Sequence, residues 1–439
     1  MQDDTFPAAE KILSDIENVI KKDLNLQSFE IIPVNDNENK SPVYHEGNSL
    51  GLASWCIQPL YCYTYNRLIE LRGNKLRREN PGTASRWLLG AILINPDIST
   101  FWNMRRELIR NGRLDSLQEL RFTRIVLYHK AKCFEAFAYR RWLIRFIIME
   151  NDQSSNINVE SLLKNEINIA IMSADRYANN YHAWSHREHV VITYEALLPN
   201  SFGELLICEW NSSKKWCCQH VSDHSGVAYR QFLLRRLLLL ERQPMESSVT
   251  IAPEQFIERR NIIVNYIKSG ITEKSNDINC LLDEQSCSNI ILHSLHCGMN
   301  KNIIIDRPDV DCERVLIALS YWIEECIFNE DLINRFPGHE SLWYHYRFLA
   351  HALKCLVTSY SKYSCYKAEI FDSRYCVRLL SDNPIHFNED QINSMSLIEI
   401  AFRYRIKNMI ECAKESQSDY QKNIVEKFVK FLAVINLQP

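Results

Sequence analysis

Histidines and cysteines are the side chains of this sequence whose spacing could bind a metal. His182, His186 and His189 are separated by four and three residues, so a helix would place them on one side. A second group is formed by His293, His296 and Cys297. Packing between repeats explains the first group more simply, and a loop or helix surface explains the second. No carboxylate–cysteine–histidine set has the spacing of a zinc site, so we predict no metal in this chain.

The composition excludes several other kinds of chemistry. The chain has 439 residues and 15 cysteines with no C-x-x-C pair, and its 51 Lys and Arg against 54 Asp and Glu give a net charge of −3. With only 11 glycines and 13 prolines, it has few tight turns and no glycine-rich phosphate loop. We expect reduced thiols, a mainly helical fold and no electrostatic support for a nucleic-acid partner. No signal-peptide pattern or membrane-spanning apolar stretch is found, which predicts a cytoplasmic protein.

A large residue followed about three positions later by arginine recurs along the chain. The copies are Trp102/Arg105, Phe137/Arg140, Trp184/Arg187, Val227/Arg230, Trp343 with Tyr346 and Arg347, and a degenerate Phe402/Arg405. Their large residues are 35, 47, 43, 116 and 59 positions apart. The shorter spacings are typical of a helical hairpin, and the 116-residue gap must hold a missing repeat or an insertion.

The motif has a physical reason, because residues i and i+3 lie on one face of a helix. We expect the large residue to fill the gap between stacked hairpins, and the arginine fork to bond carbonyl ends or acidic side chains of the neighbouring hairpin. Small polar residues just upstream are expected to cap the helices: Asp97, Ser99, Asn180 and Asp223. We therefore predict an all-α fold, an α-solenoid of stacked hairpins in a right-handed superhelix.

The predicted elements form one domain over residues 1–439. Residues 1–94 are expected to hold a helix at 1–27, a short extended piece with an irregular loop at 28–52, and helix at 53–94. Residues 95–242 hold repeats 1–4, with further helices at 116–131 and 159–178. An insertion with a helix around 253–268 is expected at 243–310, and repeat 5, the degenerate repeat 6 and C-terminal helices at 311–439.

The third copy resembles a known repeat in full. Its residues Asn180-Tyr181-His182-Ala183-Trp184-Ser185-His186-Arg187 match the Asn-Tyr-x-x-Trp-x-x-Arg centre of the protein prenyltransferase α-subunit repeat, and Asn95-Pro96 ahead of Trp102 also matches. The resemblance covers about residues 95–350, and the degenerate copy extends it toward 410. The segments 40–56, 93–108, 220–237 and 336–349 resemble the repeat-containing branch of this family, the α subunits of type III geranylgeranyltransferase.

This resemblance implies a division of the chemistry between two chains. The β subunit is expected to hold the zinc and the isoprenoid, and this chain to add side chains beside them. Lys132 aligns with a family lysine whose ammonium would stabilise charge on the diphosphate leaving group, although a solvated lysine at a helix start is the alternative. Tyr181 and His182 align with residues that line the interface near the diphosphate and the substrate, and their alternative role is capping and packing.

Two positions in the expected substrate-binding set depart from the family pattern. Phe134 stands where the family has tyrosine, so a hydroxyl is lost. Glu135 stands where farnesyltransferase has a glutamine that helps to hold the peptide's C-terminal carboxylate. A carboxylate facing a carboxylate is repulsive, so direct reading of a free CaaX terminus is disfavoured.

The resemblance implies the α subunit of a heterodimeric protein geranylgeranyltransferase, not active alone, that pairs with a Rab-type zinc-bearing β subunit. Geranylgeranyl would pass from its diphosphate to a cysteine thiolate of a protein substrate such as a SNARE. Two alternatives stay open: a non-catalytic helical-repeat scaffold for protein binding, and a farnesyltransferase or type I geranylgeranyltransferase α subunit. The remaining motif residues are expected to be structural: Trp102, Arg105, Phe137, Arg140, Trp184, Arg187, Arg230 and Trp343.

Overall fold

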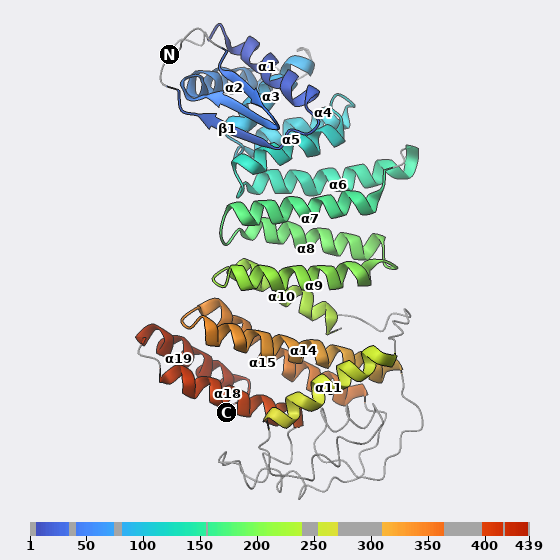
Figure 1. Cartoon of the computed structure of the whole chain (residues 1–439). Coiled ribbons are helices and arrows are strands. Elements are labelled where there is room, and N and C mark those ends of the chain that lie inside the picture. The colour runs from blue at the N-terminus through green and yellow to red at the C-terminus, as the bar shows by residue number, and fades with distance from the viewer. Residues whose placement is uncertain are drawn as a thin grey trace, which may run out of the picture. The chain divides into compact units, whose positions relative to one another are not determined.

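The computed structural model of the chain describes residues 6–34, 41–73, 81–154, 157–238, 253–270, 310–363, 397–415 and 418–437. The chain divides into two compact units, Met1–Leu205 and Leu206–Pro439. Figure 1 shows that both are built mainly of helices, as the low glycine and proline content predicts. The fold is an all-α repeat array with one small sheet.

The first unit begins with a small α/β cap. It contains α1 (Ala9–Lys22), β1 (Ser28–Ile32), β2 (Val43–Glu46), β3 (Ser49–Ala53), α2 (Ser54–Gly73) and α3 (Pro81–Ile94). The strand order is β1-β3-β2, with β1 parallel and β2 antiparallel to β3. The short extended piece predicted within 28–52 is β1, but the prediction of an irregular loop for the rest of this range is wrong at β2 and β3. Residues 35–40 of the predicted loop lie outside the described residues. Gly47, with a φ of +54°, makes the tight β2–β3 turn possible, and Leu50 and Leu52 of β3 are buried.

Helical hairpins follow the cap in the first unit. Their helices are α4 (Ser99–Arg110), α5 (Ser116–His129), α6 (Phe134–Ser154), α7 (Val159–Arg176) and α8 (Tyr181–Leu197). The helices predicted at 116–131 and 159–178 are α5 and α7. In each hairpin the arginine motif lies on the second helix. Each of these helices, α4, α6 and α8, begins a few residues before its motif copy. Figure 1 shows α6, α7 and α8 stacked in chain order.

The second unit repeats this arrangement with different connections. Its helices are α9 (Phe202–Gln219, which begins in the first unit), α10 (His224–Leu237), α11 (Pro253–Gly270), α14 (Val310–Arg335), α15 (Glu340–Tyr363), α18 (Leu397–Lys414) and α19 (Asp419–Val434). The helix predicted around 253–268 is α11. It packs against α14 and α18, so this part of the expected insertion belongs to the helical packing of the unit. The rest of the range 243–309 lies outside the described residues.

The helix caps agree with the sequence in two of the expected places. Asn180 and Asp223 are the N-cap residues of α8 and α10, and each accepts a hydrogen bond from the first turn of its helix. The other two assignments are wrong. The N-cap of α4 is Ile98, which makes no side-chain bond, while Ser99 is already the first helical residue and Asp97 lies outside the helix.

Each of three buried motif arginines bonds residues on the two helices that flank its own helix. Arg140 donates from Nε and Nη2 to the Glu166 carboxylate at 2.9 and 2.5 Å, and from Nη1 to the Leu120 carbonyl at 2.6 Å. The same pattern joins Arg105 to Glu119 and the Ser85 carbonyl, and Arg230 to Glu325 and the Trp210 carbonyl. In each case the carbonyl belongs to the arginine's own hairpin and the glutamate to a helix of another hairpin. These bonds lock the stacking of successive hairpins.

These buried networks are completed by the residue just before the motif arginine in three copies, and just before Tyr346, which stands at that position in the fifth copy. This residue bonds a glutamate that lies 20 residues earlier in the chain, in the pairs Tyr139–Glu119, His186–Glu166, Tyr229–Glu209 and His345–Glu325. Burial alone would raise the pKa of Glu166, but the Arg140 guanidinium and His186 outweigh it and hold this pKa at about 2. Glu325, with Arg230 and His345, behaves in the same way and has a pKa of about 2. Both carboxylates are therefore ionised inside the protein at neutral pH.

The large motif residues fill the spaces between the helices. Those with almost no exposed surface are Trp102, Phe137, Trp184, Val227, Trp343 and Phe402. The Trp102 indole also donates to the Pro96 carbonyl at 2.8 Å, which fixes the turn before α4. Arg187 is buried beside Trp184, with its guanidinium carbon 5.3 Å from the ring centre. The fifth copy differs, because Tyr346 donates to Glu330 at 2.8 Å, and Arg405 of the sixth copy bonds the same carboxylate.

Candidate functional site

The predicted lysine lies at the end of the hairpins where two motif helices begin. Lys132 is exposed in the turn before α6, and its ammonium nitrogen is 3.8 Å from the centre of the Tyr177 ring. Tyr177 follows α7 and is itself half exposed. A cation held over an aromatic face is oriented but keeps its charge available, because the ring supplies no carboxylate to neutralise it.

Asn180 connects this turn to the start of α8. Its side-chain amide is fully buried and donates to the carbonyls of Ala131 and Ser173 at 2.7 and 3.0 Å. Its oxygen accepts a bond from the backbone N–H of Ala183 in the first turn of α8. Asn180 therefore fixes the residue before Lys132 relative to the helix that carries the predicted Tyr181 and His182. This positioning role is separate from the capping role that the sequence suggests.

Three further predicted residues gather at the same end of α6 and α8. The Phe134 and His182 rings lie 5.4 Å apart, and the Tyr181 and His182 rings 5.6 Å apart. Phe134 is 51% exposed and Tyr181 is 68% exposed, so neither ring contributes much to the core. Large exposed aromatic rings beside a lysine are typical of a binding surface rather than of helix packing.

Glu135 lies toward a different neighbour. Burial lowers the pKa of Arg106 on α4, and the nearby Tyr139 and Glu135 oppose that shift. The carboxylate of Glu135 is thus close to a cation of the preceding hairpin. The structure brings Lys132, Phe134, Tyr181 and His182 together, and it places Glu135 beside α4.

Two arginines that sequence reasoning did not single out lie next to this group. Arg141 is half-buried and Arg145 is exposed, both on α6. Burial and the neighbouring charges of Arg141 and Lys132 lower the pKa of His182. Burial, His186, Arg141 and Arg145 lower the pKa of His189 to about 4. Both imidazoles are therefore mainly neutral at pH 7, and the charge here is that of Lys132, Arg141 and Arg145.

No carboxylate neutralises these two arginines in the part of the chain that the structure describes. Neither Arg141 nor Arg145 has a hydrogen bond or ion pair there, in contrast to Arg140 one position earlier. The signal was present in the sequence as Arg140-Arg141, but only the structure separates the paired arginine from the unpaired one. Unpaired cations beside neutral hydrogen-bonding rings favour an anionic ligand.

The other candidate positions do not form a metal site. His186, in the first histidine group, hydrogen-bonds Glu166 at 3.0 Å inside the core. His293, His296 and Cys297 lie outside the described residues. Across the described ranges, no three histidine, cysteine or acidic side chains come together as metal ligands would. None of the helices described is long and apolar enough to cross a membrane.

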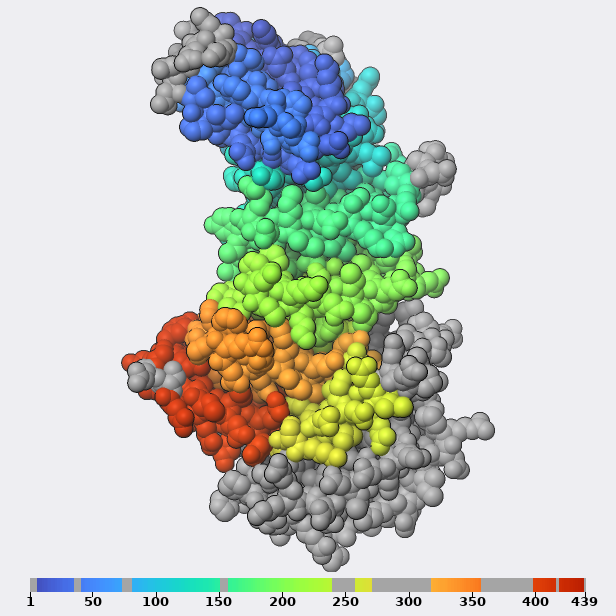
Figure 2. Space-filling model, viewed as in Figure 1, coloured from blue at the N-terminus to red at the C-terminus, as the bar shows by residue number. Residues whose placement is uncertain are grey.

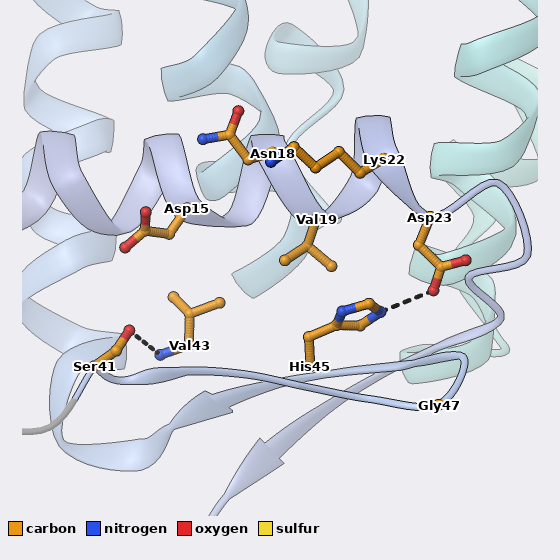
Figure 3. Close-up of a pocket in the computed structure, with 9 residues that line it drawn as sticks. All are labelled: Asp15, Asn18, Val19, Lys22, Asp23, Ser41, Val43, His45 and Gly47. Carbon is orange, nitrogen blue, oxygen red and sulfur yellow. Dashed lines mark hydrogen bonds and ion pairs between the residues drawn. The ribbon is translucent and has the colours of Figure 1, made fainter.

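A separate hollow of about 690 Å³ lies between α1 and the β2–β3 turn. Figure 3 shows Asp15 and Val19 of α1 facing Val43 and His45 across it, with His45 paired to Asp23 at 2.9 Å. None of the residues predicted to bind substrate lines this hollow. The α6–α8 end of the repeats is therefore the better candidate for the functional site.

The comparisons with known proteins agree with this architecture. The family model described as protein prenyltransferase alpha subunit repeat matches residues 116–147, 163–193 and 322–353. These ranges correspond to the hairpins α5–α6, α7–α8 and α14–α15. The chain is thus an array of prenyltransferase α-subunit repeats.

Matches to individual proteins define the family more narrowly. The chain is 30% identical to the Xenopus laevis protein prenyltransferase alpha subunit repeat-containing protein 1-B over 353 residues, which cover 77% of this chain and 71% of the relative. It is 29% identical to the Homo sapiens protein prenyltransferase alpha subunit repeat-containing protein 1 over 361 residues, covering 77% and 76%. The chain belongs to this family of repeat-containing proteins. A shorter match, 27% over 147 residues, is to the Candida albicans geranylgeranyl transferase type-2 subunit alpha, covering 31% of this chain and 37% of that protein.

Proposed function

We propose that this chain is the α subunit of a heterodimeric protein geranylgeranyltransferase that pairs with a Rab-type β subunit. The observation that carries the proposal is that the exposed Lys132 and Tyr181 and the half-buried His182 lie beside Arg141, which has no ion pair among the described residues. A diphosphate leaving group needs compensation of negative charge. This cluster offers cations and neutral donors, and no carboxylate in the described part of the chain pairs with Arg141. The match to a type-2 geranylgeranyl transferase α subunit supports the same class of reaction.

The proposed reaction forms one bond and breaks another. A protein cysteine thiolate attacks the first carbon of the geranylgeranyl group, so a C–S bond forms, the C–O bond to the diphosphate breaks, and the diphosphate leaves with that electron pair. Zinc, expected on the β subunit, would hold the thiolate. On this chain, Lys132 would stabilise the growing charge on the diphosphate. Tyr181 and the neutral His182 would each donate a hydrogen bond, and an anion bound there would raise the pKa of His182.

A single-turnover assay of the reconstituted heterodimer tests the role of Lys132. We expect Lys132→Ala to slow transfer by about 10–1000-fold, with a smaller effect on binding of geranylgeranyl diphosphate, because the contact is strongest in the transition state. Arginine at this position should rescue only in part, since its planar fork does not reproduce a compact ammonium.

Lys130→Ala is the matched control. Lys130 lies two residues earlier in the same turn and is already paired with Asp97, so its loss should leave transfer unchanged. The acceptor is a SNARE that already carries one farnesyl group and keeps a second free cysteine. If wild type and Lys132→Ala transfer at equal rates, Lys132 is a solvated surface lysine. If wild type binds the β subunit but gives no transfer, the scaffold alternative is correct.

A further inference from the structure

The surface of α6 and α8 beyond the lysine has a pattern of its own. Arg141, Arg145 and Met149 are four residues apart and share one side of α6, while His189 and Ile192 share one side of α8. The pKa effect of Arg141 and Arg145 on His189 shows that the two sides are close. These five residues are called the α6–α8 face below. Figure 2 gives the surface of these helices in teal to green.

Apolar groups lie at both ends of the cations along α6. Phe134 is 51% exposed before Arg141, and Met149 is 65% exposed after Arg145, with Ile192 45% exposed on α8. Phe134 and Met149 are 15 positions apart, about 22 Å along a helix. An isoprenoid diphosphate carries its charge at one end of an apolar tail. Here apolar residues lie on both sides of the two arginines. This order fits a protein segment whose acidic residues lie between apolar ones better than it fits an isoprenoid diphosphate.

The half-buried Arg141 gives the strongest reason to expect a partner. Three fully buried motif arginines that the structure describes, Arg105, Arg140 and Arg230, each bond a glutamate. A partly dehydrated cation without an acceptor is costly, and the described residues supply none to Arg141. An acceptor from another chain would remove that cost on binding.

We propose that the α6–α8 face binds an acidic segment of the partner subunit, with carboxylates at Arg141 and Arg145 and apolar side chains on Met149 and Ile192. This inference rests on the proposed function, because that function requires a second subunit. It identifies the surface of this chain that binds the second subunit, and the kinds of contact that form there. Charge-assisted bonds to arginine would set the register of the contact, and the apolar ends would exclude water from it.

The test measures the dissociation constant of the full chain with a Rab-type β subunit, for wild type, Arg141→Gln, Arg145→Gln and the double variant. We expect about 10-fold weaker binding for Arg141→Gln, a smaller loss for Arg145→Gln, and a weaker dependence on salt in the double variant. Arg121→Gln, at an exposed arginine on α5, is the matched control and should bind as wild type does. Melting temperatures should not fall, because Arg141 and Arg145 form no hydrogen bond or ion pair with the described residues that the change would remove, and the loss of an unpaired charge removes a cost.

The outcomes separate the two proposals. Equal β-subunit binding by wild type and the double variant would overturn the docking surface and leave the proposed function in place. Unchanged β-subunit binding with weaker binding of geranylgeranyl diphosphate would also overturn it, and would assign the arginines to the isoprenoid. A wild-type chain that does not bind the β subunit would contradict the proposed function itself, and with it the docking surface.

Discussion

Replacing Arg140 with methionine should destabilise the first unit by about 3–5 kcal/mol. The guanidinium and its partner Glu166 are only 3% and 2% exposed, so the change leaves an ionised carboxylate in the core without its main counter-charge. The Leu120 carbonyl and the Thr123 hydroxyl lose a donor at the same time. Methionine keeps much of the side-chain volume, so the cost reports the lost charge pair rather than a cavity.

The pKa of Glu166 gives a second route to the same magnitude. Its folded-state value is about 2 against an ordinary value of 4.5, and a depression of this size corresponds to roughly 3 kcal/mol. A depressed carboxyl pKa contributes stability above pH 4.5, and this stability is lost as the pH falls from 4.5 toward 2. We therefore expect wild type to lose stability over this range, and Arg140→Met to lose much less.

Hydrogen exchange read by mass spectrometry is the suitable assay, because it reports each segment and the two units need not unfold together. Peptides from α6, α7 and α8 should lose protection in Arg140→Met. The double variant Arg140→Met, Glu166→Leu should cost less than the single one, since no buried charge remains. About 1–3 kcal/mol should persist in it, because His186 loses its acceptor. A single variant that costs less than 1 kcal/mol, or a double variant that costs more than the single, would refute this reasoning.

Two further changes test the repeat packing. Trp184→Ala should destabilise the first unit by about 3–5 kcal/mol, since the ring is 3% exposed, and an unchanged melting temperature would contradict the repeat register. Asn180→Ala should cost about 2–3 kcal/mol, because the cap and two carbonyl bonds are lost together. Asn158→Ala, which removes a cap on the exposed end of α7, should cost about 1 kcal/mol and is the matched control. Equal losses at the two asparagines in chemical denaturation would show that the bonds from Asn180 to Ala131 and Ser173 add nothing.

The sequence predicts the helical array because its signal is local. A large residue and an arginine three positions apart can share a buried face only on a helix, and the large motif residues from Trp102 to Phe402 are buried on helices. The prediction for 28–52 included one short extended piece, which is β1, but it missed β2 and β3 for a related reason. They are four or five residues long, and β3 is apolar at four consecutive positions, so it shows no alternation that would separate a strand from a loop.

The partners of the arginines are harder to predict. Arg105, Arg140 and Arg230 lie 14, 26 and 95 residues before their glutamates, because the connections between hairpins differ in length. Within one hairpin the spacing is constant, and the residue before the arginine bonds a glutamate 20 positions earlier. That periodic glutamate is visible in the sequence and could have identified the buried networks. The unpaired state of Arg141 could not have been identified, since it depends on which side of α6 faces α8.

Arg140 and Arg141 show how the array separates stability from binding. One step along a helix turns a side chain by about 100°, so neighbouring arginines reach different surroundings. Arg140 points into the stack, where Glu166, the Leu120 carbonyl and the Thr123 hydroxyl all accept hydrogen bonds from its guanidinium. Arg141 lies at the edge of that stack beside His182 and His189, where none of the residues that the structure describes accepts a hydrogen bond from it. Changes at Arg140 should therefore be read out by hydrogen exchange and changes at Arg141 by partner binding. A variant of Arg141 that altered both would show that the two positions are coupled, and that the α6–α8 face also contributes to folding.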